Sequence, residues 1–391
     1  MNFKDDALDE RLNSINQKFI EDIKKLTQKT FEQLEDTKYE LTNICSLNMQ
    51  EKKIFFKKFF EKKYNMIPKI QIVPENNNNN DLNYFINVVL FIFANLENVA
   101  QFCLEEKYKE ILKKLDNNNN NNFIVLFIDL IKNMYITKNN NINIEPIHNF
   151  LKSELNKDFI SYLCQNPSIL INKLLEYLYK DIKKTNERNI IKNNFLSTVK
   201  TMKFCTKCKL LIEIQTEKKF VMNLYLKETI NKEIHEEMKS ILKPLLLDEQ
   251  LETKKFPCLT CKQDMTVYRT IENPKNYLIF NIEKSEKLKN PIKMKYSTNL
   301  KLTEVKNEKE YEFEYELIMA LTDKKTNVLN PKDNNNIINE QYNCALYFKN
   351  FIKDDWHRLI NGKYEHFKGN IKNELNEKNP NILIYKKKFR K

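Results

Sequence analysis

Two cysteine pairs of the form Cys-x-x-Cys constrain this chain more than any other feature of its sequence. The first pair is Cys205 and Cys208, and the second is Cys258 and Cys261. A two-residue spacing forms a tight turn that aims both sulfurs at one ion, and two such pairs complete a tetrahedral site. We therefore expect one structural Zn²⁺ ion, held by four thiolates with no open position for catalysis.

The surroundings of the two pairs favour a metal over disulfide bonds. Met1 is followed by charged residues at positions 4–6, so no signal peptide precedes the cysteines and a reducing, intracellular compartment is expected. A redox pair is the alternative, but a redox motif would accompany a βαβ unit, and the sequence pattern does not predict one. Flanking lysines would help to keep the sulfurs deprotonated; they are Lys203, Lys207, Lys209 and Lys262.

The other four cysteines are predicted to be small core residues, which is the usual place of a free cysteine. They are Cys45, Cys103, Cys164 and Cys344. The chain has 391 residues, of which 41% are hydrophobic, and can bury one large core or two smaller ones. Its only glycines are Gly362 and Gly369, so it has no phosphate-binding glycine loop, which argues against nucleotide chemistry.

Net charge gives a weaker indication of partners. The formal charge of +13 would permit direct contact with RNA or with an acidic protein surface. The excess lysines are dispersed, however, and no basic motif interleaved with aromatic residues stands out. Charge alone therefore does not assign a nucleic-acid-binding function.

The chain divides into an arm and a larger domain. Residues 1–40 carry apolar side chains at steps of three or four, which predicts an amphipathic helix, and 1–80 as a whole is interpreted as a helical arm and linker. Homopolymeric asparagine tracts at 76–80 and 117–122 have no apolar side chain to bury. The first tract marks a domain boundary near residue 80, and the second is a loop within the domain.

Residues 81–391 predict an α+β fold, with helices first and strands later. The apolar stretches 85–96 and 123–131 are too short to span a membrane, and the second contains Asp129, so both are interpreted as buried helices. Helical patterns continue to about residue 200. The following β-prone stretches are 220–226, 277–282, 315–321, 342–348 and 382–385.

The order of these features resembles the ubiquitin-specific protease family. Residues 277–280 are similar to the buried strand before the palm of that family, residues 315–320 to a later strand, and residues 342–350 with Trp356 to its histidine box. Upstream, residues 87–90 are similar to those that follow the nucleophile. The resemblance implies a papain-like fold with a helical thumb (about 81–200), zinc-braced β fingers (about 201–285) and a β palm (about 286–391).

The same resemblance implies that the catalytic residues have been lost. The nucleophile position holds Tyr84, the histidine position holds Gln341, and the acidic residue that orients the histidine falls at Ile360 or Asn361. A cysteine protease needs a thiolate, an imidazole to deprotonate it and a polar group to orient the imidazole. We therefore expect a pseudoenzyme with no catalytic residues.

Within the family, the chain resembles the inactive branch that is attached to the spliceosomal tri-snRNP. Residues 104–106, 108–109 and 382–387 carry this similarity. Its N-terminal ubiquitin-binding zinc finger has no counterpart here, since residues 1–80 hold only Cys45 and no histidine. The resemblance implies a scaffold in pre-mRNA splicing, located in the nucleus rather than the cytoplasm. Tri-snRNP proteins are the expected partners, and ubiquitin is an additional one.

Two other functions stay open. Residues 43–50 resemble a shortened nucleophile box, which would make Cys45 the nucleophile of an active deubiquitinase. Against it, His357 and His366 lie beyond Trp356, and His148 and His235 are on helical stretches where a solvated or capping histidine is expected. The other alternative is a zinc-stabilised interaction module, with or without ubiquitin binding.

Overall fold

The computed structural model describes most of the chain from residue 81 onward. The described residues are 57, 60, 61, 63–65, 67, 68, 81–104, 115, 122–137, 142–154, 166–185, 189–225, 236–237, 257–283, 294–306, 309–328, 339–360 and 363–388. The expected N-terminal helical arm, Cys45, Cys164, His235 and Asn361 lie outside these ranges.

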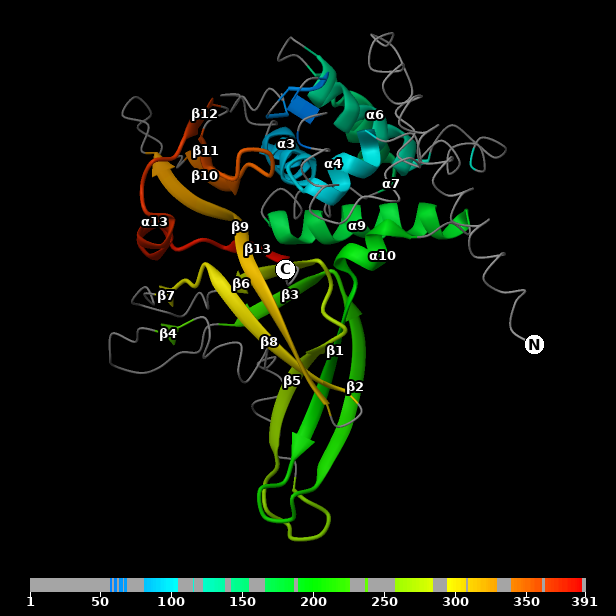
Figure 1. Cartoon of the computed structure of the whole chain (residues 1–391), viewed down its shortest axis with the longest axis vertical. Coiled ribbons are helices and arrows are strands. Elements are labelled where there is room, and N and C mark those ends of the chain that lie inside the picture. The colour runs from blue at the N-terminus through cyan, green and yellow to red at the C-terminus, as the bar shows by residue number, and fades with distance from the viewer. Residues whose placement is uncertain are drawn as a thin grey trace, which may run out of the picture.

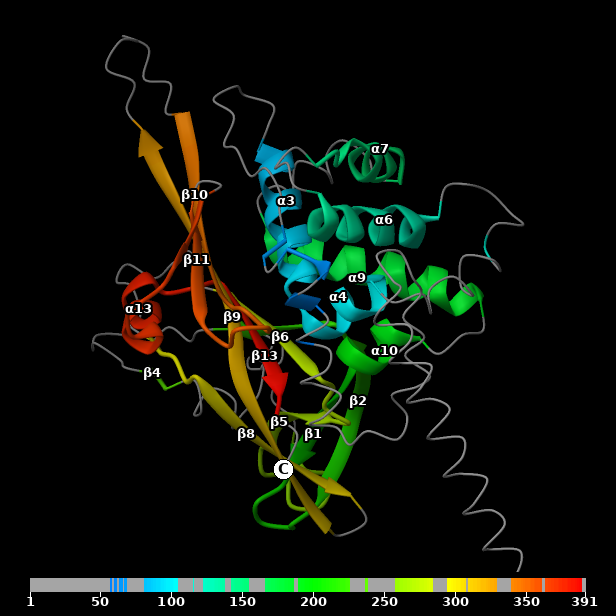
Figure 2. The same ribbon diagram turned by 45° about the horizontal axis from the view of Figure 1, so that its top comes forward.

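A helical layer forms the first part of the fold (Figure 1). It begins with α3, whose stretch from Ile86 to Ala94 is at most 6% exposed at every residue. Because α3 is apolar on all sides, it needs neighbours all round, and it packs between the other helices and a sheet (Figure 2). The helices are α3 (Asp81–Ala94), α4 (Glu97–Leu104), α6 (Phe123–Ile136), α7 (Glu145–Glu154), α9 (Pro167–Lys184) and α10 (Ile190–Phe195).

The main sheet has eight strands, seven of them in the order β12-β11-β10-β9-β13-β6-β3, with β8 paired to β9. All pairs are antiparallel except β3 with β6. A short helix, α13 (Ile371–Lys378), joins β12 to β13. The strands are β3 (Val221–Tyr225), β6 (Tyr277–Glu283), β8 (Asn299–Lys306), β9 (Lys309–Val328), β10 (Asn339–Lys349), β11 (Trp356–Ile360), β12 (Lys363–His366) and β13 (Ile382–Lys387).

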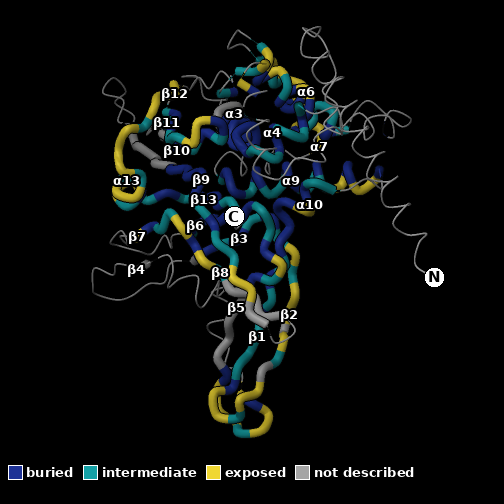
Figure 3. The backbone as a smooth tube through the Cα atoms, in the orientation of Figure 1, coloured by how far each residue is buried: buried dark blue, intermediate teal, exposed yellow. Residues whose placement is uncertain are grey.

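A separate three-stranded sheet, β2-β1-β5, extends away from the body and ends in the two cysteine turns (Figure 1). It consists of β1 (Ser197–Phe204), β2 (Leu211–Lys219) and β5 (Thr266–Glu272). Two further two-residue strands, β4 (Glu236–Glu237) and β7 (Met294–Lys295), pair in parallel beside the main sheet. The extension is thin, and its far end is mostly exposed (Figure 3).

The main sheet buries side chains on both faces. Leu346 and Phe348 of β10 pack into the cluster that contains α3, whereas Tyr347 packs into a second cluster on the other face. This alternation follows from the two-residue period of a strand. On the second face, the hydroxyl of Tyr347 donates to Glu374 of α13 at 2.6 Å, so the short helix covers that side.

A polar network joins the helices to the sheet. The side-chain oxygen of Asn194 in α10 accepts hydrogen bonds from the amides of Asn98 at 2.8 Å and of Asn276 at 2.7 Å. The Tyr277 hydroxyl of β6 donates to the Asn98 side chain at 3.0 Å, and the Tyr277 ring stacks on Phe195 with centroids 5.2 Å apart. Buried polar groups that lose their partners cost about 1–3 kcal/mol each, so this network holds α4, α10 and β6 in one arrangement.

The buried helices and the β-prone stretches expected after residue 80 are present. The two apolar stretches are the buried parts of α3 and α6, and the five β-prone stretches lie in β3, β6, β9, β10 and β13. Strand β1 begins at Ser197, within the range expected to be helical, and β3 and β6 belong to the main sheet. In the described part of the chain, no single helix is long and apolar enough to cross a membrane; a pair bent by 83°, Ile86–Ala94 with Glu97–Leu104, passes that test together.

The expectation for His148 was wrong, because this histidine lies in α7 with only 7% of its surface exposed. Its Nε2 atom is buried without a hydrogen-bond partner. Burial, with a smaller contribution from the charge of Lys152, lowers the pKa of His148 to about 4. The imidazole is therefore neutral in the folded protein. Protonation of the imidazole in acid favours the unfolded chain.

We expect His148 to make the fold sensitive to acid. Below pH 6.5 the unfolded chain binds a proton at this site that the folded chain excludes, so the stability contribution is full above that pH and falls toward pH 4. The loss should reach roughly 1–3 kcal/mol in the free energy of unfolding. Urea unfolding of His148→Phe and of the parent at pH 7, 6 and 5 measures the difference.

Replacing Leu151, a buried residue of the same helix, by Ala is the matched control, because it removes no titratable group; it should leave the pH dependence of unfolding as it is in the parent. Comparing each variant with the parent at the same pH cancels the contribution of metal loss. Equal slopes for His148→Phe and the parent would contradict the prediction.

Candidate metal centre and candidate active site

The four cysteines of the two pairs meet at the far end of the three-stranded sheet. Their Sγ atoms all lie within 4.8 Å of one another, with 3.5 Å between Cys205 and Cys261 and 3.9 Å between Cys208 and Cys258. A disulfide would bring two sulfurs to about 2.05 Å, so the four are free thiols arranged around one point. Cys103 and Cys344, by contrast, are buried in the core as expected.

The donor set fits a tetrahedral zinc ion. With Zn–S bonds of about 2.3 Å, the edges of the tetrahedron measure about 3.8 Å, which lies between the two sulfur distances observed. Cys205 and Cys258 are fully buried, and Met265 and Ile212 pack beside them. Four sulfur ligands leave no position for substrate, so a metal here would hold the two turns together and would not take part in catalysis.

The two turns have the same backbone geometry. The Cys205 amide donates to the Leu210 carbonyl at 2.9 Å, and the Cys258 amide donates to the Gln263 carbonyl at 2.8 Å. In each turn the residue after the second cysteine is left-handed, with φ 55° at Lys209 and 59° at Lys262. A lysine in this region costs about 1 kcal/mol relative to glycine, so the ligand arrangement is maintained against backbone strain.

The pKa values of Cys258 and Cys208 are shifted in opposite directions. Hydrogen bonds from the Cys261 and Thr260 amides lower the pKa of Cys258 to about 6. The pKa of Cys208 rises to about 12, chiefly through its hydrogen bond with Cys261 and then through desolvation. The backbone amides thus have the largest effect on the pKa of Cys258. The sequence had suggested that the flanking lysines would have this effect.

We expect one zinc ion per chain. Chelation should remove the ion together with the folded extension, and Cys258→Ser should lower zinc content by more than tenfold, because structural zinc is bound with about 10–16 kcal/mol of free energy. Metal analysis and circular dichroism before and after chelation are the measurements. Cys344→Ala, in the core, is the matched control and should keep its zinc. A metal-free protein with an intact extension would contradict the prediction.

The three positions at which the resemblance expects catalytic residues fall on separate elements. Tyr84 lies near the start of α3, and Gln341 lies near the start of β10, where it pairs with Thr326 of β9. Ile360 is half-buried at the end of β11, opposite Ala345 of β10. The side chains of Tyr84 and Gln341 are not among those described, and Asn361 and Cys45 lie outside the described residues altogether.

The direction in which α3 runs shows how Tyr84 and Gln341 lie relative to each other. The Phe91 ring packs on Phe348 with centroids 5.1 Å apart. Asn95, just beyond the end of α3, and Lys349, the last residue of β10, line the same small pocket. Helix α3 and strand β10 thus run in the same direction along the seam between the helices and the sheet. The first turn of α3 and the start of β10 therefore lie toward the same end of that seam.

A histidine–aspartate cluster lies at the other end of β10. Asp355 contacts His357 Nε2 at 3.1 Å and His366 Nε2 at 3.4 Å, and the His357 ring stacks on Phe348 with centroids 5.5 Å apart. Sequence reasoning set both histidines aside. The register β10–β11–β12 places them opposite each other, and only the pairing of the three strands reveals this.

The adjacent pocket is charged, but its described lysines are paired. Lys349 contacts Glu316 at 3.2 Å and Asp354 at 3.0 Å, and Lys386 pairs with Glu97. Lys349 thus links β10 to β9 and to the turn that follows β10. Lys386 links β13 to α4. The pocket therefore ties helices to sheet, and no free nucleophile lies in it.

Comparison with solved structures identifies the architecture. The chain is similar to the SAGA Ubp8/Sgf11/Sus1/Sgf73 DUB module bound to ubiquitin aldehyde, with a TM-score of 0.61, 12% identity, and coverage of 84% of this chain and 71% of that one. The chain has the fold of a ubiquitin-specific protease. It is also similar to the same module bound to monoubiquitin, with a TM-score of 0.58, 14% identity, and coverage of 89% and 77%.

A splicing factor has the same architecture. The crystal structure of an essential yeast splicing factor matches with a TM-score of 0.55, 13% identity, and coverage of 87% of this chain and 79% of that one. No family model and no curated protein sequence matches the chain. Identities of this size establish the ubiquitin-specific protease fold alone. The expected thumb, fingers and palm architecture is therefore confirmed, while the identity of the metal and the roles of the degenerate positions stay predictions.

Proposed function

We propose that this chain is a catalytically inactive scaffold with the ubiquitin-specific protease fold, acting in nuclear pre-mRNA splicing. The observation that carries the proposal is the combination of that fold with Tyr84 and Gln341 at the positions where the resemblance expects a thiol and an imidazole; Ile360 or Asn361 stands where it expects the acidic residue. A phenol and an amide cannot supply the thiolate and the imidazole of a cysteine protease.

The described histidines do not replace the missing imidazole. His357 lies opposite Phe348, and seven residues of extended strand, roughly 23 Å, separate Phe348 from Gln341. Asp355 and His357 do form a carboxylate–imidazole pair, which is the observation in favour of the competing proposal, an active deubiquitinase using Cys45. The position of that pair at the wrong end of β10 favours the scaffold.

The splicing assignment rests on two kinds of support. The sequence similarity noted at residues 104–106, 108–109 and 382–387 is to the tri-snRNP branch of the family. The splicing factor among the structural neighbours covers most of the chain. In this proposal tri-snRNP proteins are the partners and the nucleus is the location. Ubiquitin is a further ligand, and the net charge of +13 permits direct contact with RNA.

The three parts of the fold divide this task. We assign the helices from residue 81 to about 196 as the thumb, β1, β2 and β5 as the fingers, and the eight-stranded sheet as the palm. In this proposal the palm and fingers present the protein-docking surface. The polar network around Asn194 and the ion pair between Glu97 and Lys386 keep thumb and palm fixed relative to each other.

We expect ubiquitin carrying a thiol-reactive C-terminal warhead to form no adduct with the chain, because no activated thiolate is present at the expected site. Gel shift and mass spectrometry measure adduct formation, and an active deubiquitinase treated in parallel verifies the reagent. Capture that disappears in Cys45→Ala would overturn the pseudoenzyme assignment. Reversible ubiquitin binding without capture would retain it and identify ubiquitin as a partner.

The register of the degenerate positions has a direct test in the same assay. The triple variant Tyr84→Cys, Gln341→His and Ile360→Asp should gain capture, and Tyr84→Cys alone should react at least tenfold more slowly, since an imidazole lowers the pKa of a thiol. Equal reactivity of the single and triple variants would show that these positions do not form one site.

Affinity purification of the tagged chain from nuclear extract tests the splicing assignment. We expect U-type small nuclear RNAs and tri-snRNP proteins to co-purify above an untagged control, and a point variant that unfolds the extension, Cys258→Ser, to retain less of them. Purification without any snRNP component would contradict the splicing role and leave the fold assignment intact.

A further inference from the structure

The far end of the fingers exposes apolar side chains that the fold itself does not use. Leu259 has 81% of its surface exposed, more than any other large hydrophobic side chain in the described part of the chain, and Leu210 is 38% exposed. Each leucine belongs to one of the two cysteine turns, which are distant in sequence and are brought together by the sulfur cluster. Removing apolar surface from water is favourable, so the folded chain gains little from these two side chains as they stand.

Single exposed leucines are common, and their neighbours decide what this pair means. The lysines near the two leucines in sequence are all exposed; they are Lys207, Lys209 and Lys262. None of the three has a side-chain partner among the described residues, whereas elsewhere on the fingers Lys200 pairs with Glu213 and Glu272.

Backbone geometry gives a separate indication that the lysines matter. The described part of the chain has five left-handed residues other than glycine. Two are the turn lysines at 209 and 262, and three are asparagine or aspartate, which tolerate this conformation better. The chain is rich in asparagine, which would relieve the strain at both turns. Both turns thus keep lysine where asparagine would fit with less strain, which leaves a cationic side chain beside each cysteine pair.

We infer that the two turns form a docking surface for an acidic protein segment that carries an aliphatic side chain. The surface consists of Leu210, Leu259, Lys207, Lys209 and Lys262, and we call it the fingertip surface. Protein interfaces combine apolar with charged side chains. Three exposed lysines without partners among the described residues, against the single acid of the two turns, Asp264, call for carboxylates on the partner.

Protein fits this surface better than nucleic acid. Single-stranded RNA is bound by stacking its bases on aromatic or arginine side chains, and residues 205–210 and 258–264 contain neither. A leucine, in contrast, inserts into an apolar pocket of a protein. The fingertip surface is small, at the end of a thin extension (Figures 1 and 3), so it would contribute a secondary contact that strengthens binding made elsewhere on the chain.

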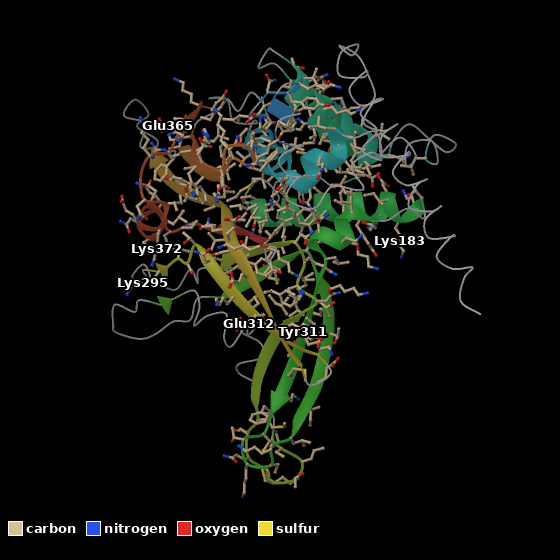
Figure 4. The ribbon with its side chains drawn as sticks, in the orientation of Figure 1. Lys183, Lys295, Tyr311, Glu312, Glu365 and Lys372 are labelled. Carbon is tan, nitrogen blue, oxygen red and sulfur yellow. The ribbon has the colours of Figure 1, made fainter. Side chains whose placement is uncertain are left out.

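Other exposed lysines provide internal controls. Lys183 at the end of α9, Lys295 in β7 and Lys372 in α13 are also exposed and without side-chain partners among the described residues. Figure 4 shows them around the body of the protein, away from the fingers. They match the fingertip lysines in charge and exposure, and none of the five large exposed hydrophobic side chains lies in α9, β7 or α13.

The test uses the full zinc-loaded chain and a synthetic glutamate-rich peptide with one central leucine, treated with a carbodiimide. This reagent activates a peptide carboxylate, which the lysine amine attacks to form an amide, with release of the urea. Mass spectrometry then locates the modified lysines. We expect modification to concentrate at Lys207, Lys209 and Lys262, and to fall about tenfold with Leu259→Asp or with a peptide whose leucine is replaced by serine.

Tyr364→Asp, which removes another exposed hydrophobic side chain on β12, should leave the yield unchanged. Retained zinc and an unchanged circular dichroism spectrum verify that Leu259→Asp still folds. Equal modification of Lys183, Lys295 and Lys372 would overturn the proposal, as would insensitivity to Leu259→Asp. Preferential protection of the fingertip lysines by a uridine oligonucleotide or by free ubiquitin would also overturn it, and would leave the proposed scaffold function standing.

Discussion

The rest of the structure depends on the burial of α3. A helix that is apolar around its whole circumference cannot lie at a surface, so one side must be covered by helices and the other by a sheet. Phe93 packs against Phe127 of α6, and Phe91 packs against Phe348 of β10, which satisfies both requirements. The arrangement of thumb and palm therefore follows from the apolar composition of α3. It persists although the positions that the resemblance assigns to catalysis carry unreactive side chains.

The arrangement of thumb and palm does not depend on the positions that the resemblance assigns to catalysis. The contacts that join helices to sheet come from Asn194, Asn98, Tyr277 and the ion pair of Glu97 with Lys386, and none of these residues is among the positions that the resemblance assigns to catalysis. A chain that keeps these contacts keeps its shape while its catalytic positions change freely. The fold occurs both in a deubiquitinase module and in a splicing factor, in line with the rule that a fold does not determine a function.

The sequence predicted the buried helices and the central strands because their apolar residues follow simple periods. It predicted the cysteine cluster because ligand spacing is local, although the two turns are distant along the chain. It missed β1 and β2, whose lysine-rich and glutamate-rich strands are only partly buried and so lack an apolar run. It also missed the contacts of Asp355 with His357 and His366, since these depend on the register of three strands. The exposed leucines at 210 and 259 gave no sequence signal, because their accessibility is a property of the folded turns.

Strand β9 has a mechanical consequence. Its 20 residues, roughly 65 Å of extended chain, pair with β8 at the start, with β13 in the middle and with β10 at the end. One continuous peptide backbone therefore links the side of the palm nearest the fingers to the hairpin that carries Gln341, without an intervening loop. Force applied where β8 and β9 meet would pass along covalent bonds and a ladder of hydrogen bonds. A partner that pulls on that region would move the strands of the palm together as one rigid body.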